Sequence, residues 1–139
     1  MLILDTNVLS EILRPTPDAA VLVWLEAQPR SQLFTTAITR AEILYGISLL
    51  SKGPRRQKLQ TVARAIFDED LEDKVLAFDG PAADQSAQIA ARRTQAGKPI
   101  SQLDAMIAAI AKAQQARLAT RNIRDFVDCD IQIIDPWTA

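Results

Sequence analysis

The residues best suited to chemistry in this sequence are acidic side chains that follow predicted strands or begin predicted helices. Asp5 comes directly after an apolar run, Glu42 and Asp104 fall in the first turns of predicted helices, and Asp125 follows a late strand. The chain contains no histidine, which excludes Ser-His-Asp and Cys-His triads, histidine general bases and the common zinc sites. Any catalysis must therefore use carboxylates, amines or hydroxyls.

Carboxylates that gather in one place favour metal chemistry. They repel one another, so the pKa of at least one rises unless a cation restores the balance. All-oxygen ligands suit hard divalent cations, and Mg²⁺ or Mn²⁺ can activate a water molecule and stabilise charge on a phosphodiester. If Asp5, Glu42, Asp104 and Asp125 converge, the chemistry favoured by these residues is metal-dependent phosphodiester hydrolysis.

Each of these acids also has a purely structural interpretation. Thr39-x-x-Glu42 fits a helix capping box, and Ser101-x-x-Asp104 approximates one. Asp5 could form a local Asx turn that leads into the first helix. Against this, a carboxylate placed directly after an apolar strand approaches a buried edge and needs a partner.

Asp125 and a further acidic segment are weaker candidates for a metal site. Asp125 stands close to Arg121 and Arg124 in the sequence, and a surface salt bridge would explain it equally well. The acidic residues between positions 68 and 73 are expected to form a solvated helix end, so we exclude them from the site.

Strands and helices alternate along the chain, as is typical of an α/β fold. Hydrophobic periodicity and turn residues predict strands at 2–4, 33–38, 75–78, 117–120 and 131–134. Helices are predicted at 7–13, 17–29, 39–53, 54–70 and 81–96, and from 101 onward, with Asn7 and Thr39 as N-caps of the first and third. This order favours a parallel sheet covered on both faces, in which ligands bind beyond the carboxyl ends of the strands.

Composition supports one domain spanning residues 1–139. The sequence is 48% hydrophobic, which is enough for an ordinary core. No signal peptide or transmembrane segment is apparent, and the single cysteine, Cys129, fits a reducing compartment, so we expect a cytoplasmic protein. The net charge of −1 is not that of a dedicated nucleic-acid-binding module. A nucleic-acid substrate would require local basic patches or bound metal ions.

Several basic and aromatic residues could contact such a substrate, although most are expected to be ordinary solvated charges or core residues. The arginines that could hold phosphates are Arg14, Arg40, Arg55, Arg56, Arg92, Arg93, Arg121 and Arg124. Trp24 and Trp137 could stack on bases, but core packing is the expectation for both.

The sequence resembles PIN-domain ribonucleases of the VapC toxin group, especially its FitB-like branch. The resemblance rests on motifs that cover essentially the whole chain, in the same order and at similar separations. They are Leu4-Asp5-Thr6-Asn7-Val8 with Ser10-Glu11, Thr39-Arg40-Ala41-Glu42-Ile43 with Tyr45-Gly46, Leu103-Asp104-Ala105-Met106-Ile107-Ala108, Ala119-Thr120-Arg121-Asn122 with Asp125-Phe126, and Asp135-Pro136-Trp137. The resemblance implies a PIN-like three-layer α/β/α sandwich with a five-stranded parallel sheet of order 3-2-1-4-5.

The resemblance also implies a metal-dependent endoribonuclease in which Asp5, Glu42 and Asp104 bind Mg²⁺ or Mn²⁺. Thr6 and Thr120 match hydroxyl residues that support the site. The sequence departs from the family pattern at Asn122, where FitB-like relatives commonly have an aspartate. Either Asn122 takes part through water, or Asp125 supplies the missing charge as a fourth catalytic acid. The loss of one negative charge favours one firmly bound ion over two.

The resemblance further implies three partners: an RNA substrate, a VapB-type antitoxin whose tail fills a groove on the toxin, and a second copy of the chain in a homodimer. Two other functions remain open. One is an aspartate-based phosphatase with Asp5 as nucleophile, although the sequence lacks a second aspartate two residues further on. The other is a catalytically weak module that only binds RNA or protein, which Asn122 makes conceivable.

Overall fold

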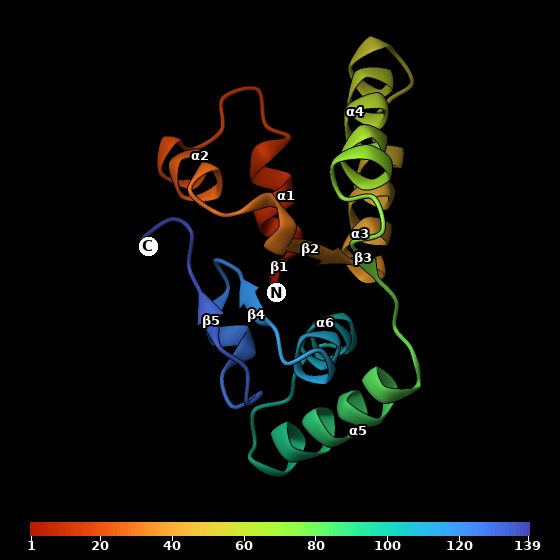
Figure 1. Cartoon of the computed structure of the whole chain (residues 1–139). Coiled ribbons are helices and arrows are strands. Elements are labelled where there is room, and N and C mark those ends of the chain that lie inside the picture. Colours follow the sequence, from red (N-terminus) through yellow and green to blue (C-terminus); the bar gives the residue numbers. More distant parts are fainter.

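A five-stranded parallel sheet separates two layers of helices in the computed structural model, which describes all residues from 1 to 139 (Figure 1). The strands are β1 (Leu2–Leu4), β2 (Leu33–Thr36), β3 (Val75–Leu76), β4 (Arg117–Ala119) and β5 (Ile133–Ile134). Their order in the sheet is β3-β2-β1-β4-β5, and every neighbouring pair is parallel. The predicted fold class and strand order are therefore confirmed.

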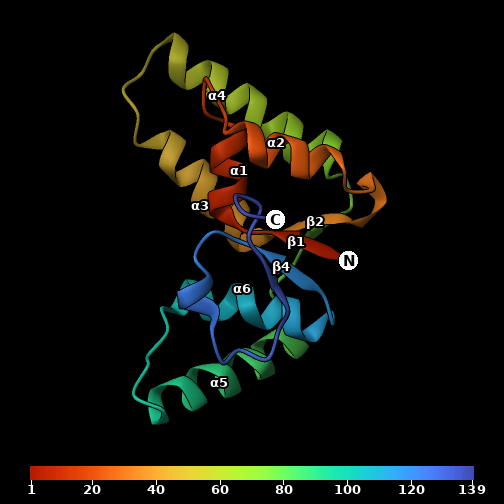
Figure 2. The ribbon, with the colours of Figure 1, turned by 90° about the vertical axis from the view of Figure 1, so that its left-hand side faces the viewer.

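The helices divide into two groups, one on each face of the sheet (Figure 2). They are α1 (Thr6–Ile12), α2 (Ala19–Glu26), α3 (Ala37–Ser48), α4 (Pro54–Ala65), α5 (Gly80–Gln95) and α6 (Gln102–Ala113). The first four lie on one face, and α5 and α6 pack together on the other. None of these helices combines the length and apolar composition that spanning a membrane requires.

The central strand β1 is apolar throughout because it is buried on both faces. Successive side chains of a strand point to opposite faces, so Ile3 enters the core between the sheet and α5 and α6. Leu2 and Leu4 enter the core on the side of α1 to α4. Leu118 and Ala119 of the neighbouring strand β4 divide between the two cores in the same way.

Helix α6 is buried in the core between the sheet and α5, and much of its buried surface is alanine. Ala105, Ala108, Ala109 and Ala111 are all at most 2% exposed. Small side chains let the backbone of α6 come close to α5, with which it makes most of its backbone contacts, and not only to the sheet that the sequence predicts. This packing fixes the first turn of α6, which carries Asp104, against the end of the sheet.

The predicted N-caps of two helices are wrong by a few residues. Asp5, and not Asn7, caps α1, because its side chain accepts a hydrogen bond from the backbone N–H of Thr6. Thr36, and not Thr39, caps α3, because its hydroxyl accepts from the N–H of Thr39 at 3.1 Å. Strand β2 consequently ends at Thr36, two residues earlier than predicted.

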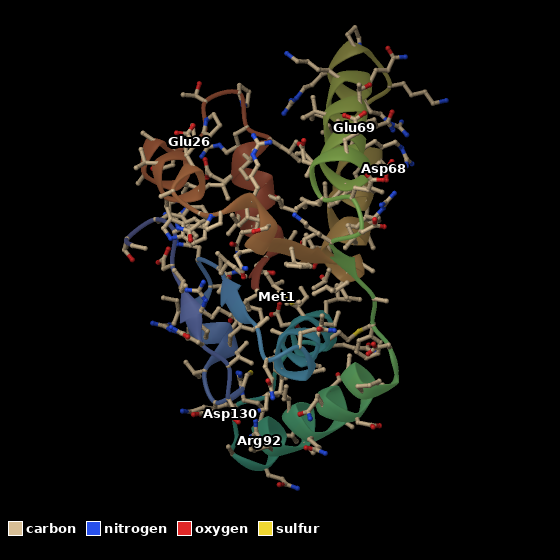
Figure 3. All side chains as sticks on the ribbon, viewed as in Figure 1. Met1, Glu26, Asp68, Glu69, Arg92 and Asp130 are labelled. Carbon is tan, nitrogen blue, oxygen red and sulfur yellow. The ribbon has the colours of Figure 1, made fainter.

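The two edge strands and the end of the fourth helix also differ from the predictions. β3 and β5 each contain only two residues, because an edge strand has a neighbour on one side only. The predicted helix from 54 to 70 is α-helical as far as Ala65 and then continues as a π-helical turn over Ile66–Asp70. Figure 3 shows Asp68 and Glu69 of that turn at the surface, which agrees with the prediction of a solvated acidic end.

Candidate active site

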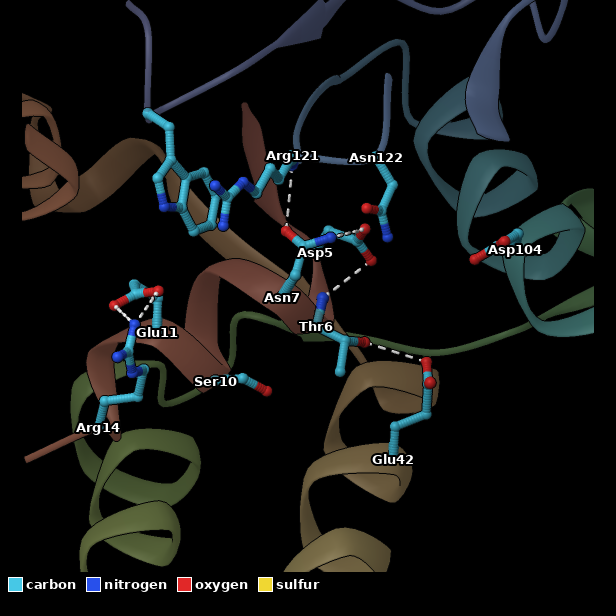
Figure 4. Close-up of a pocket in the computed structure, with 11 residues that line it drawn as sticks. Asp5, Thr6, Asn7, Ser10, Glu11, Arg14, Glu42, Asp104, Arg121 and Asn122 are labelled. Atoms are coloured by element: carbon cyan, nitrogen blue, oxygen red, sulfur yellow. Dashed lines mark hydrogen bonds and ion pairs between the residues drawn. The ribbon is translucent and has the colours of Figure 1, made fainter. Parts of the chain in front are cut away.

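The carboxyl ends of β1, β2 and β4 meet at a polar pocket of about 450 Å³ (Figure 4). Its lining residues are Asp5, Thr6, Asn7, Ser10, Glu11, Arg14, Glu42, Asp104, Arg121, Asn122 and Trp137. Three of the predicted acids, Asp5, Glu42 and Asp104, are among them although they come from distant parts of the chain. The parallel topology explains this convergence, because parallel strands end at the same edge of the sheet.

Asp5 is the most buried of the lining residues and is held by several hydrogen-bond donors. Its side chain is only 3% exposed. One carboxylate oxygen, Oδ1, accepts from the backbone N–H of Thr6 at 2.8 Å. The other, Oδ2, accepts from the hydroxyl of Thr120 at 2.7 Å and from the amide of Asn7 at 3.2 Å. These bonds fix the orientation of the carboxylate before any ligand binds.

Asn7 and Thr120 connect the end of β1 to the loop after β4. The amide nitrogen of Asn7 donates to the Thr120 hydroxyl at 3.1 Å, and its carbonyl oxygen accepts from the backbone N–H of Arg121 at 3.2 Å. The Thr120 hydroxyl also accepts from the backbone N–H of Asn122 at 3.1 Å. Thr120, which is predicted to support the site, thus donates a hydrogen bond to Asp5, and Asn7 donates to the same carboxylate oxygen.

Glu42 is positioned by a threonine from the first helix. The hydroxyl of Thr6 donates to Glu42 Oε1 at 3.0 Å and lies 3.0 Å from the hydroxyl of Thr39. Glu42 is one turn beyond Thr39 on α3, and Thr39 is not the cap of that helix. The capping-box interpretation of Thr39-x-x-Glu42 is therefore wrong, and the Glu42 carboxylate is directed to the pocket (Figure 4).

Burial and neighbouring acids disfavour the charged form of Asp5. Loss of hydration raises its pKa from the ordinary 3.8 to about 6. The hydrogen bonds from Thr120 and Thr6 lower the pKa in part, whereas the negative charges of Asp104 and Glu42 raise it further. Asp104 and Glu42 therefore both act electrostatically on the Asp5 carboxylate.

Asp104 enters the pocket from the first turn of α6. Ser101 caps this helix, since its hydroxyl accepts from the backbone N–H of Asp104 at 3.2 Å, so this structural interpretation is confirmed for Ser101. The Asp104 carboxylate is nevertheless part of the pocket lining. Burial raises its pKa, the charge of Asp125 acts in the same direction, and Ser101 and Arg93 act in the opposite one. The first turn of α6 therefore contains both a helix cap, Ser101, and a residue that lines the pocket, Asp104.

The structure separates Asn122 from Asp125. Asn122 lines the pocket, whereas Asp125 lies in the short helix η3 (Ile123–Phe126), is exposed and is not a lining residue. Asp125 reaches the site only through its electrostatic effect on Asp104. The suspected surface salt bridges of Asp125 with Arg121 and Arg124 do not form.

The donor set suits a hard divalent cation, although the acids are not packed into a closed coordination cage. All the candidate ligands are oxygens, and burial beside other carboxylates leaves Asp5 with an unfavourable charge that a cation would neutralise. No group of three acidic side chains lies close enough to enclose an ion by itself. Mg²⁺ commonly binds through one or two carboxylates while retaining several waters, so the arrangement fits that mode of binding.

Glu11, for which the sequence predicts no role, is one of the lining residues of the pocket. Its side chain is only 6% exposed and accepts two hydrogen bonds from the Arg14 guanidinium, at 3.2 and 3.0 Å. It also accepts from the backbone N–H of Asp18 at 3.0 Å, which fixes the connection between α1 and α2. The Glu-x-x-Arg spacing could have indicated the pair, but not the burial of Glu11.

Trp137 differs in part from the prediction of core packing. Its indole packs partly against the core on the side of α1 to α4, but it also lines the pocket, where the guanidinium carbon of Arg121 lies 5.0 Å from the ring centre. Trp24, in contrast, is buried in that core as predicted.

Comparison with known proteins identifies the family. Residues 2–131 match the PIN domain. The chain is 38% identical to the VapC ribonuclease Y4jK of Sinorhizobium fredii over 99% of this chain and 98% of that protein. It is 36% identical to the toxin FitB of Neisseria gonorrhoeae, over 99% of each chain. A solved structure of FitAB bound to the IR36 DNA fragment contains a chain with 36% identity and a TM-score of 0.93, with 99% of this chain and 96% of that one covered. With its fold, its pocket at the strand ends and these matches in agreement, the chain belongs to the PIN-domain family.

Proposed function

We propose that this protein is a metal-dependent endoribonuclease that acts as the toxin of a VapBC-type toxin-antitoxin pair. The observation that carries the proposal is the convergence of Asp5, Glu42 and Asp104 on one polar pocket of a PIN-domain chain. Relatives with more than a third of their residues in common are named as a VapC ribonuclease and as the toxin FitB. The acids supply the chemistry, and the relatives suggest the substrate class.

The residues that would hold Mg²⁺ or Mn²⁺ are Asp5, Glu42 and Asp104, with the carbonyl oxygen of Asn122 available at the same pocket. A bound divalent ion would supply an activated water and would stabilise negative charge on the phosphodiester. One neutral amide in place of an acid favours a single firmly bound ion. We place Asn122 at the fourth position of the site, and Asp125 outside the residues that contact the ion.

The chain's own hydrogen bonds keep the acids in place for this role. Thr6, Asn7 and Thr120 donate to Asp5, and the Thr6 hydroxyl also donates to Glu42. The carboxylates therefore need little rearrangement when a ligand arrives, and the free energy of binding is not spent on ordering them. Both oxygens of Asp5 already accept internal hydrogen bonds, an arrangement that suits a ligand-binding carboxylate better than the nucleophile of a phosphatase.

A groove next to the pocket supports the proposed antitoxin partner. This groove of about 790 Å³ lies between α1, α3 and α4 and shares Thr6, Ser10, Arg14 and Glu42 with the pocket. Much of its lining is apolar, and a peptide segment seated in it would reach the acids directly. We propose that a VapB-type antitoxin binds here and blocks the site, and that the toxin forms homodimers.

The direct test is RNA cleavage by purified protein, followed by sequencing of the RNA ends. Wild-type protein should cut RNA with Mg²⁺ or Mn²⁺, and Asp5→Ala and Asp104→Asn should be inactive. Asp84→Asn is the matched control, because Asp84 is an exposed acid on α5 outside the pocket. Cleavage that persists in EDTA or in the Asp5 and Asp104 variants would contradict the mechanism.

Metal titration separates the enzyme from a module that only binds RNA or protein. If the acids bind Mn²⁺ in the folded state alone, the ion at about 100 times its Kd should stabilise the fold by roughly 2.7 kcal/mol. The Asp5→Ala variant should lose most of this stabilisation. A wild-type unfolding curve that does not respond to Mn²⁺ would favour the binding module.

A further inference from the structure

We propose that Arg121, stacked on Trp137, is a binding residue for a backbone phosphate of single-stranded RNA at the edge of the acidic pocket. The inference deepens the proposed function and rests on it, since it names how a polyanion is held beside a cluster of carboxylates. Such a pocket repels phosphates by itself, so a substrate of this kind needs a cationic side chain nearby.

Among the arginines of the pocket, Arg121 is the one whose charge is available. Arg14 also lines the pocket, but both oxygens of the buried Glu11 carboxylate accept hydrogen bonds from its guanidinium. Arg121 makes no ion pair and donates no side-chain hydrogen bond within the chain. Its positive charge is therefore not neutralised by the protein.

A second stacked arginine in the same fold shows what a purely structural arrangement looks like. Arg40 lies 5.4 Å from the ring centre of Phe67 and forms an ion pair with Asp68 at 3.1 Å. Arg121 has the same kind of aromatic contact, with Trp137 at 5.0 Å, but no acidic partner. The comparison indicates that the partner of Arg121 is supplied from outside the chain.

Stacking leaves the hydrogen-bonding edge of Arg121 free. The N–H groups of a guanidinium point outward in its plane, whereas the indole covers only one of its faces. A phosphate can therefore accept two hydrogen bonds from that edge while the stack limits the motion of the side chain. The planar fork suits a phosphate better than a lysine ammonium would.

Both members of the stack are anchored through their backbones. The N–H of Arg121 donates to the Asn7 side chain, which itself donates to Asp5. The N–H of Trp137 donates to the side chain of Asp135 at 2.9 Å. A phosphate on Arg121 would thus be held at a fixed place relative to Asp5, as a strand in position for cleavage requires.

The experiment measures binding of a short fluorescent oligouridylate by anisotropy, in EDTA and at several salt concentrations. We compare wild-type protein with Arg121→Ala, Arg121→Lys and Trp137→Phe. Arg124→Ala is the matched control, because Arg124 is an exposed arginine in the same segment that does not line the pocket. Thermal unfolding of each variant verifies that it is folded.

Arg121→Ala should weaken binding by about tenfold, as expected for loss of a charge-assisted contact. The slope of log Kd against log salt should fall by about 0.7, the value for one phosphate contact on a single strand. Arg121→Lys should restore the slope but not the full affinity, and Arg124→Ala should resemble wild type. In Mg²⁺, Arg121→Ala should raise KM for RNA much more than it lowers kcat.

The two proposals fail in distinguishable ways. Loss of affinity and salt slope in Arg121→Ala, with no RNA cleavage by wild type, would refute the nuclease but support the phosphate contact. Equal affinity and slope in Arg121→Ala and Arg124→Ala would overturn the contact whether or not RNA is cut. If poly-glutamate of equal charge competes with the oligouridylate, and its binding depends on Arg121 to the same extent, the partner of Arg121 is a carboxylate and the phosphate contact is also overturned.

Discussion

Replacement of Asp5 by asparagine should stabilise the metal-free protein while it removes the proposed activity. The Asp5 carboxylate is buried, and its pKa is raised to about 6. Below the pKa of Asp5 in the unfolded chain, near 3.8, the side chain is protonated in both states and does not change the stability. As the pH rises from there through the folded-state pKa of about 6, the buried side chain must become charged, and the free energy of unfolding falls. The metal-free wild type should therefore lose stability between about pH 4 and pH 7.

The size of the effect follows from the pKa difference. At about 1.4 kcal/mol for each pKa unit, a rise from 3.8 to about 6 corresponds to about 3 kcal/mol of folding free energy at neutral pH. Asparagine avoids this penalty, but its NH₂ group replaces an acceptor that faces the donors of Thr120 and Asn7, a mismatch of about 1 kcal/mol. The net gain expected for Asp5→Asn at pH 7.5 is about 2 kcal/mol.

Urea unfolding in EDTA, followed by tryptophan fluorescence, measures this gain. At pH 4, where the charge penalty of Asp5 is nearly absent, Asp5→Asn should be slightly less stable than wild type because of the hydrogen-bond mismatch, and the order should reverse as the pH rises. Addition of Mn²⁺ should stabilise the wild type and stabilise Asp5→Asn much less. The electrostatic reasoning is refuted if the variant is less stable than wild type at pH 7.5 in EDTA, or if the difference between them does not change with pH.

Three further predictions concern residues around the site. Asn122→Asp should tighten Mn²⁺ binding by about tenfold in a titration, since it adds a charged ligand, whereas Asp125→Asn should change the affinity little; the opposite order would place Asp125 in the site. Glu11→Gln should lower the free energy of urea unfolding by about 2 kcal/mol, because Arg14 and the connection to α2 lose a charged acceptor. Unchanged stability would show that the buried Glu11 carboxylate makes no strong contact. Arg93→Met should lower the free energy of unfolding by about 3 kcal/mol and speed hydrogen exchange at residues 123–130, because the buried Arg93 guanidinium donates to the carbonyls of Asp125 and Val127. Hydrogen exchange at the wild-type rate would show that other contacts hold this loop.

The sheet and most helices were predictable because their signals are local. The run Leu2–Leu4 is apolar at every position, as a strand buried on both faces must be, and Pro and Gly residues mark the ends of several helices. Caps were less predictable, since Thr36 and Thr39 both have the chemistry of a cap. Only the point at which β2 leaves the sheet decides between them, and that depends on tertiary pairing.

Asp5, Glu42 and Asp104 could be predicted to lie at this edge of the sheet from their places at the end of a strand or near the start of a helix, but their environment could not. Sequence gives no sign that Glu11 and Arg93 are buried, because charged residues at helical spacing are usually solvated. The place of Trp137 in the pocket depends on how the chain turns after β5, where Asp135 accepts from the Trp137 N–H. Asn122 and Asp125 are only three positions apart, and the geometry of a short irregular turn determines which of them faces the pocket.

The hydrogen bond between Thr120 and Asp5 joins residues that are 115 positions apart, and the strand beside β1 is formed by residues 117–119. During synthesis the ribosome makes the acidic end of β1 almost at once, whereas its partner strand emerges only after most of the chain has been translated. The pocket therefore cannot assemble on a nascent chain that ends before residue 117. The proposed active site thus stays incomplete until nearly all of the chain has been synthesised.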